Sequence, residues 1–244
     1  MKYESDGLVL KVSDVGESDR VISVLTREYG LIRAFANGAK RYKSSSQSAT
    51  QALCYSHFIF HSSRDSYVID EAKSIETFFR LREDIEKLSL AQYFCELCEE
   101  LAPEMDEAND YLRLALNCLH MLVTEKRSPL FLKATAELRM LSLAGYMPEL
   151  NTCGICGKGI DADCRFDVSN GVLTCTGCSA SGFPVTIGTV YAMRHICYAP
   201  FEKLFSFEMK EDALKHLSGI SEKYLKVQTN KSFKALEFYN KLFF

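Results

Sequence analysis

Four cysteines in the second half of the chain have the residue type and spacing of a metal site. They form two Cys-x2-Cys pairs, which are made up of Cys153, Cys156, Cys175 and Cys178. Each pair can place two thiolates on one tight loop, and two such loops together supply the four tetrahedral donors that structural zinc requires. Because four thiolates leave no open position for a reacting water molecule, the pattern predicts one structural Zn²⁺ ion.

The segment between the two pairs predicts how they come together. Two short runs typical of strands, 164–168 and 172–174, flank Ser169-Asn170-Gly171, and Asn-Gly between such runs is a strong hairpin signal. A hairpin would fold the second pair back beside the first. Cys164 adds another sulfur within reach, so the ligand set stays open here. Thiols without a metal, redox chemistry and disulfides are the alternative interpretations of the pattern.

Composition and charge limit the classes of protein to which the chain can belong. Of its 244 residues 47% are hydrophobic, which is enough for folded cores, and the formal net charge is −3. The charge is +2 over residues 1–82, −7 over 83–150 and +2 over 151–244, so either end can carry a basic surface. The N-terminus has no apolar signal region, and no run approaches the roughly 20 apolar residues that span a bilayer. We therefore expect a cytoplasmic protein with reduced cysteines and no membrane partner.

The order of the predicted elements indicates the fold class. Runs rich in β-branched, aliphatic and aromatic residues mark strands at 7–12, 20–26, 31–36, 52–60 and 66–75. Five short strands suit a small β-barrel, of which the OB-fold is a common nucleic-acid-binding example. Helical spacing of apolar residues, or a helical composition, then marks 85–102, 112–122, 131–141, 185–197, 203–217 and 233–243.

These elements predict an α+β multidomain protein, with an N-terminal OB-fold β-barrel followed by an α-helical domain that carries an inserted four-cysteine zinc loop. The barrel takes residues 1–77. The helical domain takes 78–152 and resumes at 179–244, and the zinc loop occupies 153–178 between its two parts.

A short basic segment follows the third predicted strand. Lys40, Arg41 and Lys43 surround Tyr42 and precede the hydroxyls of Ser44–Ser46. Cations neutralise phosphates, and a tyrosine can stack on a base. The alternative is a loop that is simply solvated. The nucleic-acid interpretation gains from four further cations on nearby strands, which are Lys11, Arg20, Arg27 and Arg33.

Other constellations favour structural roles. Cys95 and Cys98 lie three apart on an apolar helical stripe, which indicates core thiols more than a redox dithiol. His57 and His61 share a strand face but have no third metal ligand beside them in the sequence. The motifs of nucleotide-phosphate loops, zinc proteases, serine hydrolases and zinc deaminases are missing, so we do not expect an enzyme. The aromatic face of 233–243 would pack on the core, or else bind a partner peptide in a groove with a basic rim.

Taken together, the motifs resemble the RecO family of bacterial recombination-mediator proteins. The N-terminal part of the resemblance is carried by Gly7-Leu8-Val9-Leu10-Lys11, Gly16-Glu17-Ser18-Asp19-Arg20, Thr26-Arg27-Glu28-Tyr29-Gly30 and Gly38-Ala39-Lys40-Arg41. It continues in Glu137-Leu138-Arg139-Met140-Leu141 and Gly145-Tyr146-Met147-Pro148-Glu149-Leu150, directly before Cys153-x-x-Cys156-Gly157. The order and spacing match over nearly the whole chain.

The resemblance implies a protein that binds single- and double-stranded DNA, anneals complementary strands, and works with RecR to load RecA onto strands coated by single-stranded DNA-binding protein. It also implies binding of that coating protein's C-terminal tail by the helical domain, and a place in the cytoplasm at the nucleoid. Carried over by position, the expected DNA contacts are Lys40, Arg41, Lys43, Arg27 and Arg33. The competing hypotheses are a helical zinc adaptor that barely touches DNA and a redox enzyme that uses Cys95 and Cys98.

Overall fold

The computed structural model describes residues 2–40, 46–63 and 66–243. The chain divides into two compact units, each with its own core. Unit 1 comprises Met1–Lys126 together with Phe233–Phe244, and unit 2 comprises Arg127–Ser232. The domain boundaries drawn from the sequence stay a prediction.

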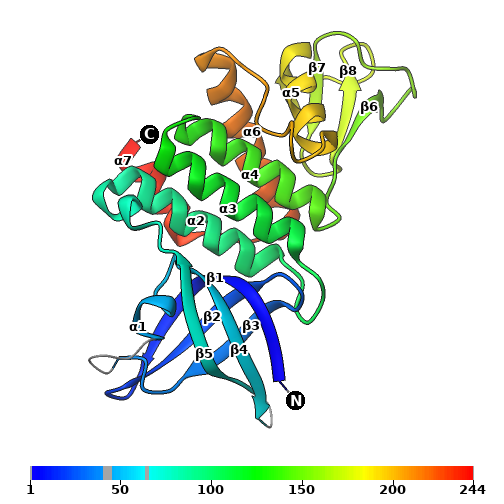
Figure 1. Ribbon diagram of the computed structural model, residues 1–244. Helices are drawn as coiled ribbons and strands as arrows, with labels where there is room; N and C mark the ends of the chain where they lie inside the picture. Colours follow the sequence, from blue (N-terminus) through cyan, green and yellow to red (C-terminus); the bar gives the residue numbers. More distant parts are fainter. Residues whose placement is uncertain (1, 41–45, 64–65, 244) are drawn as a thin grey trace. The chain divides into compact units, whose positions relative to one another are not determined.

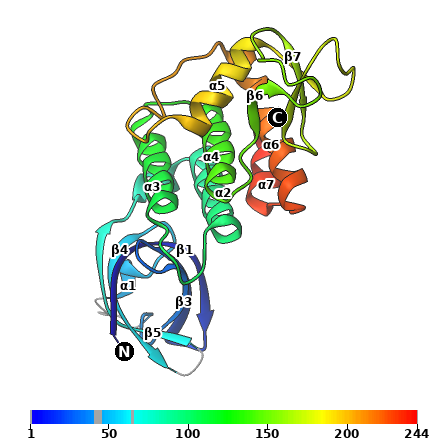
Figure 2. The same ribbon diagram turned by 90° about the vertical axis from the view of Figure 1, so that its right-hand side faces the viewer.

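Unit 1 contains a closed five-stranded barrel (Figures 1 and 2). Its strands are β1 (Lys2–Val15), β2 (Asp19–Thr26), β3 (Gly30–Ala36), β4 (Tyr55–Ser63) and β5 (Ser66–Glu76). They follow one another around the barrel in the order β1-β2-β3-β5-β4, and β4 pairs with β1 to close it. All neighbouring pairs are antiparallel except β3 and β5, which are parallel. The predicted OB-fold barrel is confirmed, although β1 is longer at both ends than the predicted strand.

Alternation along β3 shows how the sequence fills the barrel. Ile32 and Ala34 point into the interior and are 2% and 0% exposed, whereas Arg33 and Phe35 between and beyond them face outward. Phe58 and Phe60 of β4 stack on each other inside, with ring centroids 5.4 Å apart. The barrel is therefore a packed core with a polar outer face.

Helices of unit 1 form a second layer on the barrel. They are the one-turn α1 (Ser46–Ala49), the 3₁₀ helix η1 (Phe79–Glu83), α2 (Ile85–Leu101), α3 (Asn109–Thr124) and α7 (Lys234–Phe243). The carboxylate of Asp84 caps α2 by accepting from the backbone amides of Glu86 and Lys87. The last helix packs on α2, where Leu236 is fully buried. The core-packing interpretation of 233–243 is confirmed for this face, while Phe238 on the other face is exposed.

Unit 2 combines three helices with a small sheet. The helices are α4 (Pro129–Leu143), α5 (Ile187–Tyr198) and α6 (Glu211–Thr229), and the strands are β6 (Glu149–Cys153), β7 (Cys164–Asp167), β8 (Val172–Cys175) and β9 (Phe183–Val185). The sheet order is β6-β8-β7-β9. Ser128 caps α4 by accepting from the amide of Phe131, and Pro129 occupies the first turn, where no amide hydrogen is needed.

The prediction of a helix over 203–217 is wrong for residues 203–210, and it ends too early, because the helix runs to Thr229. Residues 203–205 lie in a turn, where the amide of Lys203 bonds to the carbonyl of Pro200 and Leu204 is buried without being helical. The helix begins at Glu211, whose acidic side chain suits the positive end of a helix dipole, and it runs to Thr229. Within the described ranges, no helix is long and apolar enough to cross a membrane.

Candidate metal centre and nucleic-acid interface

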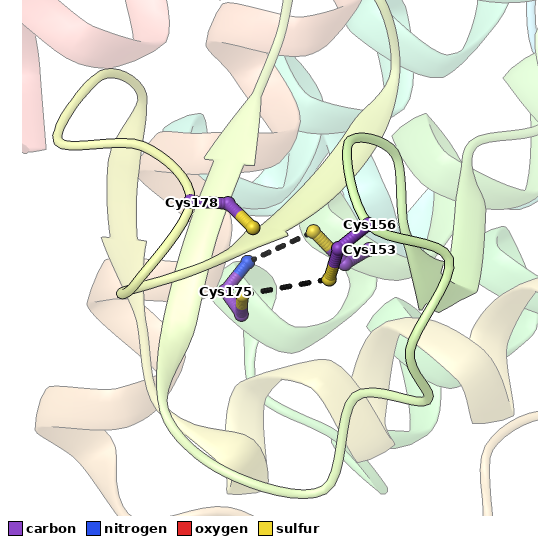
Figure 3. Close-up of side chains that lie close together, drawn as sticks. All are labelled: Cys153, Cys156, Cys175 and Cys178. Atoms are coloured by element: carbon purple, nitrogen blue, oxygen red, sulfur yellow. Dashed lines mark hydrogen bonds between the residues drawn. The ribbon is translucent and has the colours of Figure 1, made fainter.

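The four predicted cysteines converge in unit 2. Figure 3 shows their sulfur atoms pointing toward a common centre, and all four sulfurs lie within 4.8 Å of one another. The Sγ atoms of Cys156 and Cys175 are 3.9 Å apart. Four sulfurs at about 2.3 Å from a tetrahedral zinc are about 3.8 Å from each other, so the spacing fits such an ion. This group can hold a metal ion.

The predicted hairpin is confirmed, and it is what returns the second pair to the first. Asp167 of β7 pairs with Val172 of β8, and the amide of Gly171 closes the turn by donating to the Asp167 carbonyl at 2.8 Å. The side-chain amide of Asn170 donates to the Asp167 carboxylate at 2.7 Å, and this bond lowers the pKa of that carboxyl, with smaller contributions from the backbone amides of Ser169 and Asn170. The turn is therefore set by its own residues.

The first pair is held against β8 by backbone contacts. The amide of Gly154 donates to the carbonyl of Leu173 at 2.8 Å, and a Cβ atom at Gly154 would meet the Val172 side chain at 3.0 Å. Gly157 has a φ of 71° and its amide bonds back to the Cys153 carbonyl. Gly157 therefore supplies a positive φ, whereas Gly154 allows close packing against β8.

The electrostatics of the cluster favour deprotonation at one sulfur. Backbone amides of Cys156, Cys175 and Ile155 donate to the Cys153 sulfur and lower the pKa of its thiol to about 6. The neighbouring sulfurs of Cys175 and Cys156 instead raise the pKa of Cys178 to about 12. A metal cation bound at the centre would balance the negative charge of the thiolates, and metal binding to thiols favours their deprotonation.

Cys164 lies apart from the cluster. It pairs in register with Cys175 on the neighbouring strand and is buried, and burial raises the pKa of its thiol to about 11. Among the described residues the candidate ligands are the four cysteines of the two pairs, so Cys164 is a packing residue of β7.

The predicted DNA contacts are only partly brought together. Arg41 and Lys43 lie outside the described residues. Lys40 follows β3 and its ammonium lies 3.1 Å from the Asp14 carboxylate. Arg27 is exposed beyond β2 and donates weakly to the Tyr55 hydroxyl at 3.4 Å, whereas Arg33 stands on the outer face of β3. Their role in binding DNA stays a prediction.

Arg33 borders a small hollow that sequence reasoning missed. The hollow measures about 160 Å³ and is lined by Lys11, Ser13, Val21, Ser23, Arg33 and Glu99. Glu99 comes from α2, far along the chain, and nothing in the local pattern around it indicates that it reaches the barrel face. Its approach requires α2 to pack against β1, which only the folded unit shows.

The remaining candidate residues have structural environments. Cys95 and Cys98 are buried on α2, and burial raises the pKa of both thiols, so neither is an accessible thiolate. His57 contacts Asp6 and Glu4, and His61 contacts Asp70, on the outer face of the barrel. These contacts fit the structural roles that the sequence favours for both histidines.

Comparisons with known proteins cover almost the whole chain. Residues 1–78 match the family model described as "Recombination protein O N terminal", and residues 82–237 match "Recombination protein O C terminal". The "DNA repair protein RecO" of Acetivibrio thermocellus is 33% identical over 242 residues, which are 98% of this chain and 96% of that protein. The protein of the same name from Alkaliphilus metalliredigens is 27% identical over 99% of this chain and 100% of its own length. The chain belongs to the RecO family of DNA repair proteins.

Proposed function

We propose that the protein is a non-enzymatic recombination mediator that binds single- and double-stranded DNA and anneals complementary strands. The observation that carries this proposal is the closed OB-type barrel with outward-facing cations, in a chain of a DNA repair family. Barrels of this type bind oligonucleotides on their outer strands and loops.

Annealing breaks no covalent bond, so the protein needs only to neutralise the negative charge of the DNA phosphates. Lysine and arginine side chains bound to two strands reduce the repulsion between their phosphates and release condensed counterions. Holding both strands on one surface also raises their local concentration, which speeds pairing. The exposed Arg27 and Arg33 and the partly exposed Lys40 are the described residues assigned to this surface, with Arg41 and Lys43 beside them in the sequence.

The proposed partners follow from the family. With RecR the protein helps to load RecA onto strands coated by single-stranded DNA-binding protein. The C-terminal tail of that coating protein docks on the helical domain. The protein acts in the cytoplasm, at the nucleoid. The metal is proposed to be one structural zinc ion held by Cys153, Cys156, Cys175 and Cys178. Four thiolates around one ion suit zinc, and the ion would brace unit 2 without taking part in annealing.

A strand-annealing assay tests the assignment of the basic segment. The variant Lys40→Ala/Arg41→Ala/Lys43→Ala should anneal complementary oligonucleotides more slowly than the unchanged chain. Its control is Lys126→Ala/Lys203→Ala/Lys210→Ala, which removes the same charge from three exposed lysines outside the barrel. Equal annealing rates for the unchanged chain and the barrel variant would remove these residues from the interface.

A second candidate function is a helical zinc adaptor that bridges proteins and hardly touches DNA. Two observations favour it: the carboxylate of Asp14 lies beside both Lys40 and Arg20, and α7 exposes Phe238 and Leu242. Fluorescence titration of a labelled single strand at several salt concentrations separates the two functions, because only direct DNA binding weakens steeply as salt rises.

A further inference from the structure

The outer face of β1, β2 and β3 carries a row of polar residues that meet across the strands. Ser23 of β2 stands opposite Lys11 of β1 on one side and opposite Arg33 of β3 on the other. Ser13 lies two residues beyond Lys11 and therefore points to the same face. These four side chains line the hollow of about 160 Å³, so two cations and two hydroxyls surround one small space.

A β-bulge places Lys11 in this row. The register of β1 against β2 shifts between Val9 and Lys11, so that Leu10 is an extra residue in the strand. Val9 fills the barrel interior and Val12 packs against the same core, which puts both Lys11 and Ser13 on the outside. Without the bulge, Lys11 would have faced the interior, so the irregularity serves to aim this cation outward.

Among the described residues, the two cations of the hollow differ from Arg20 and Lys40 in having no carboxylate within ion-pair distance. In the described part of the chain no carboxylate lies within 4.0 Å of Lys11 or Arg33, whereas Lys40 and Arg20 both lie beside Asp14. Glu99 of α2 lines the same hollow but forms no ion pair there. Glu96 of the same helix also interacts electrostatically with Lys11, but it lies outside the hollow and interacts with Lys234 as well. Within the hollow two cations face one carboxylate, which leaves a net positive charge that attracts an anion.

An aromatic ring stands directly beside the hollow. Phe35 follows Arg33 by two residues on the outer face of β3, is 37% exposed, and pairs in register with Val21, which also lines the hollow. Proteins that bind single-stranded DNA place an exposed aromatic ring next to cations. The ring stacks on an unpaired base while the cations neutralise the neighbouring phosphate. A double helix keeps its bases stacked inside and offers none to this ring.

We infer that Lys11, Arg33 and Glu99 form one phosphate subsite for single-stranded DNA, in which the Glu99 carboxylate competes with the phosphate for the two cations. The inference rests on the proposed DNA binding and specifies where one nucleotide lies. The backbone phosphate enters the hollow between Lys11 and Arg33 and accepts from Ser13 and Ser23, and the adjacent base stacks on Phe35. Glu99 repels the phosphate and keeps the subsite weak, so that strands can be exchanged during annealing.

Removing the two cations tests the binding of phosphate. Full-length Lys11→Ala/Arg33→Ala should bind a fluorescein-labelled oligothymidylate more weakly, and the slope of log K against log salt should be shallower by about 0.7 for each phosphate that is no longer neutralised. Lys73→Ala is the control, because Lys73 is an exposed lysine on β5, outside the hollow. Since all three side chains lie on the surface, the variants should keep the wild-type thermal midpoint.

Removing the carboxylate tests the competition in the opposite direction. Glu99→Gln should bind the same oligonucleotide about fivefold more tightly, because a repulsion between charges a few ångströms apart is removed. The control is Glu71→Gln, which removes an exposed carboxylate from β5 and should leave affinity unchanged. A tighter complex and slower strand exchange in Glu99→Gln alone support the subsite, whereas equal affinities of the two variants contradict the role of Glu99.

An abasic oligonucleotide separates phosphate from base. Phe35→Ala should weaken binding of oligothymidylate about fivefold or more and leave binding of an abasic chain unchanged, whereas Lys11→Ala/Arg33→Ala should weaken both. The subsite would be overturned if Lys11→Ala/Arg33→Ala kept the wild-type affinity and salt slope. If Lys40→Ala/Arg41→Ala/Lys43→Ala still bound more weakly, the proposed function would remain supported. Failure of the unchanged chain to bind either oligonucleotide would overturn both.

Discussion

The cysteines in and beside the candidate metal centre differ in exposure, so substitutions can distinguish a metal ligand from a buried packing residue. Cys156 is exposed, so its substitution opens no cavity in the core, whereas Cys164 is buried beside the cluster. We expect Cys156→Ser to lose its bound metal, measured by elemental analysis of the purified protein, because one of four donors is gone. Cys164→Ala should retain one metal ion per chain despite the cavity that it creates. Retention of metal by Cys156→Ser and loss by Cys164→Ala would contradict the assigned ligands.

A buried ion pair joins α4 to α6 within unit 2. The Lys133 ammonium lies 2.9 Å from Glu137 and 2.9 Å from Glu222, and it also donates to the Ser218 hydroxyl at 3.2 Å. Ser221 donates to the Glu137 carboxylate as well. Burial disfavours the charged form of Lys133, but the two carboxylates outweigh it and raise the pKa of Lys133.

Removing Lys133 should therefore be costly. Lys133→Met leaves the carboxylate of Glu137, which is 0% exposed, without its cation, and we expect the free energy of unfolding in urea to fall by about 3–5 kcal/mol. Lys133→Met/Glu137→Gln should recover part of this loss, because an uncharged amide replaces the buried carboxylate. An equal or larger loss in the double variant would indicate that packing, not charge, dominates at this position.

The same lysine predicts how stability depends on pH. Because its pKa is higher in the folded than in the unfolded chain, the contribution of Lys133 is fully present below its ordinary pKa of 10.5 and is lost as pH rises through the folded value. Urea unfolding between pH 8 and pH 11, in steps of about one unit, should show a steeper alkaline loss for the unchanged chain than for Lys133→Met/Glu137→Gln. Parallel curves would contradict this contribution.

Some of the site residues could be predicted from the sequence, and others could not. Cys153 and its three partners were predictable because spacing alone constrains where their sulfurs can lie. Lys133 and Glu137 are one helical turn apart, yet Glu222 joins them from another helix, and local pattern cannot predict that meeting. Glu99 was missed for the same reason, since its position beside Lys11 depends on the packing of α2 on β1.

At the scale of elements, the β7–β8 hairpin depends on Gly171. This glycine has a φ of 66°, and a Cβ atom there would lie 2.7 Å from the Tyr224 hydroxyl, which donates to the Tyr146 carbonyl. Gly171→Ala should lower the free energy of unfolding by about 1–3 kcal/mol and weaken metal binding, because backbone strain and a steric clash act together.

Gly145→Ala is the matched control for the hairpin. Gly145 also has positive φ, at 88°, but no atom of the described residues lies within 4 Å of an added Cβ, so only the backbone strain of about 1 kcal/mol is expected. Thermal unfolding followed by circular dichroism compares the two variants. An equal loss in both would show that contact with Tyr224 does not matter.

Elements with local signals were predicted well, and elements governed by distant contacts were not. The hairpin turn was predicted because it is determined by neighbouring residues, namely Asp167, Ser169 and Asn170. The bulge at Leu10 leaves no such signal, because Val9, Leu10 and Val12 are all apolar. A helix was predicted over 203–217, yet Leu204 and Phe205 at its start are buried within a turn.

On the scale of the whole molecule, the candidate metal centre and the barrel belong to different compact units. The cysteine cluster belongs to unit 2, whereas the barrel and the hollow at Arg33 belong to unit 1. Closure of the barrel through β1 and β4 and the parallel pairing of β3 with β5 join segments far apart in the sequence. A list of five strands suggested a barrel but could not determine this order.

Metal removal should act on unit 2 first. After chelation with a strong zinc chelator, verified by elemental analysis, amide hydrogen exchange should rise in 149–175 and α5 before it rises in β1–β5, because the metal links the loops of unit 2. Binding of a labelled oligonucleotide should change less than the exchange rates do. Unchanged exchange and thermal midpoint after complete metal removal would contradict a structural role.

The central claim is that the basic outer face of the barrel binds DNA strands through their phosphates. The most direct measurement is the affinity of the unchanged full-length chain for a labelled single strand at increasing salt, paired with the same titration of Lys40→Ala/Arg41→Ala/Lys43→Ala. We predict that log K falls linearly with log salt, and that the variant has a lower affinity and a shallower slope. Affinity that is absent, or that is the same in both proteins at every salt concentration, would contradict the claim.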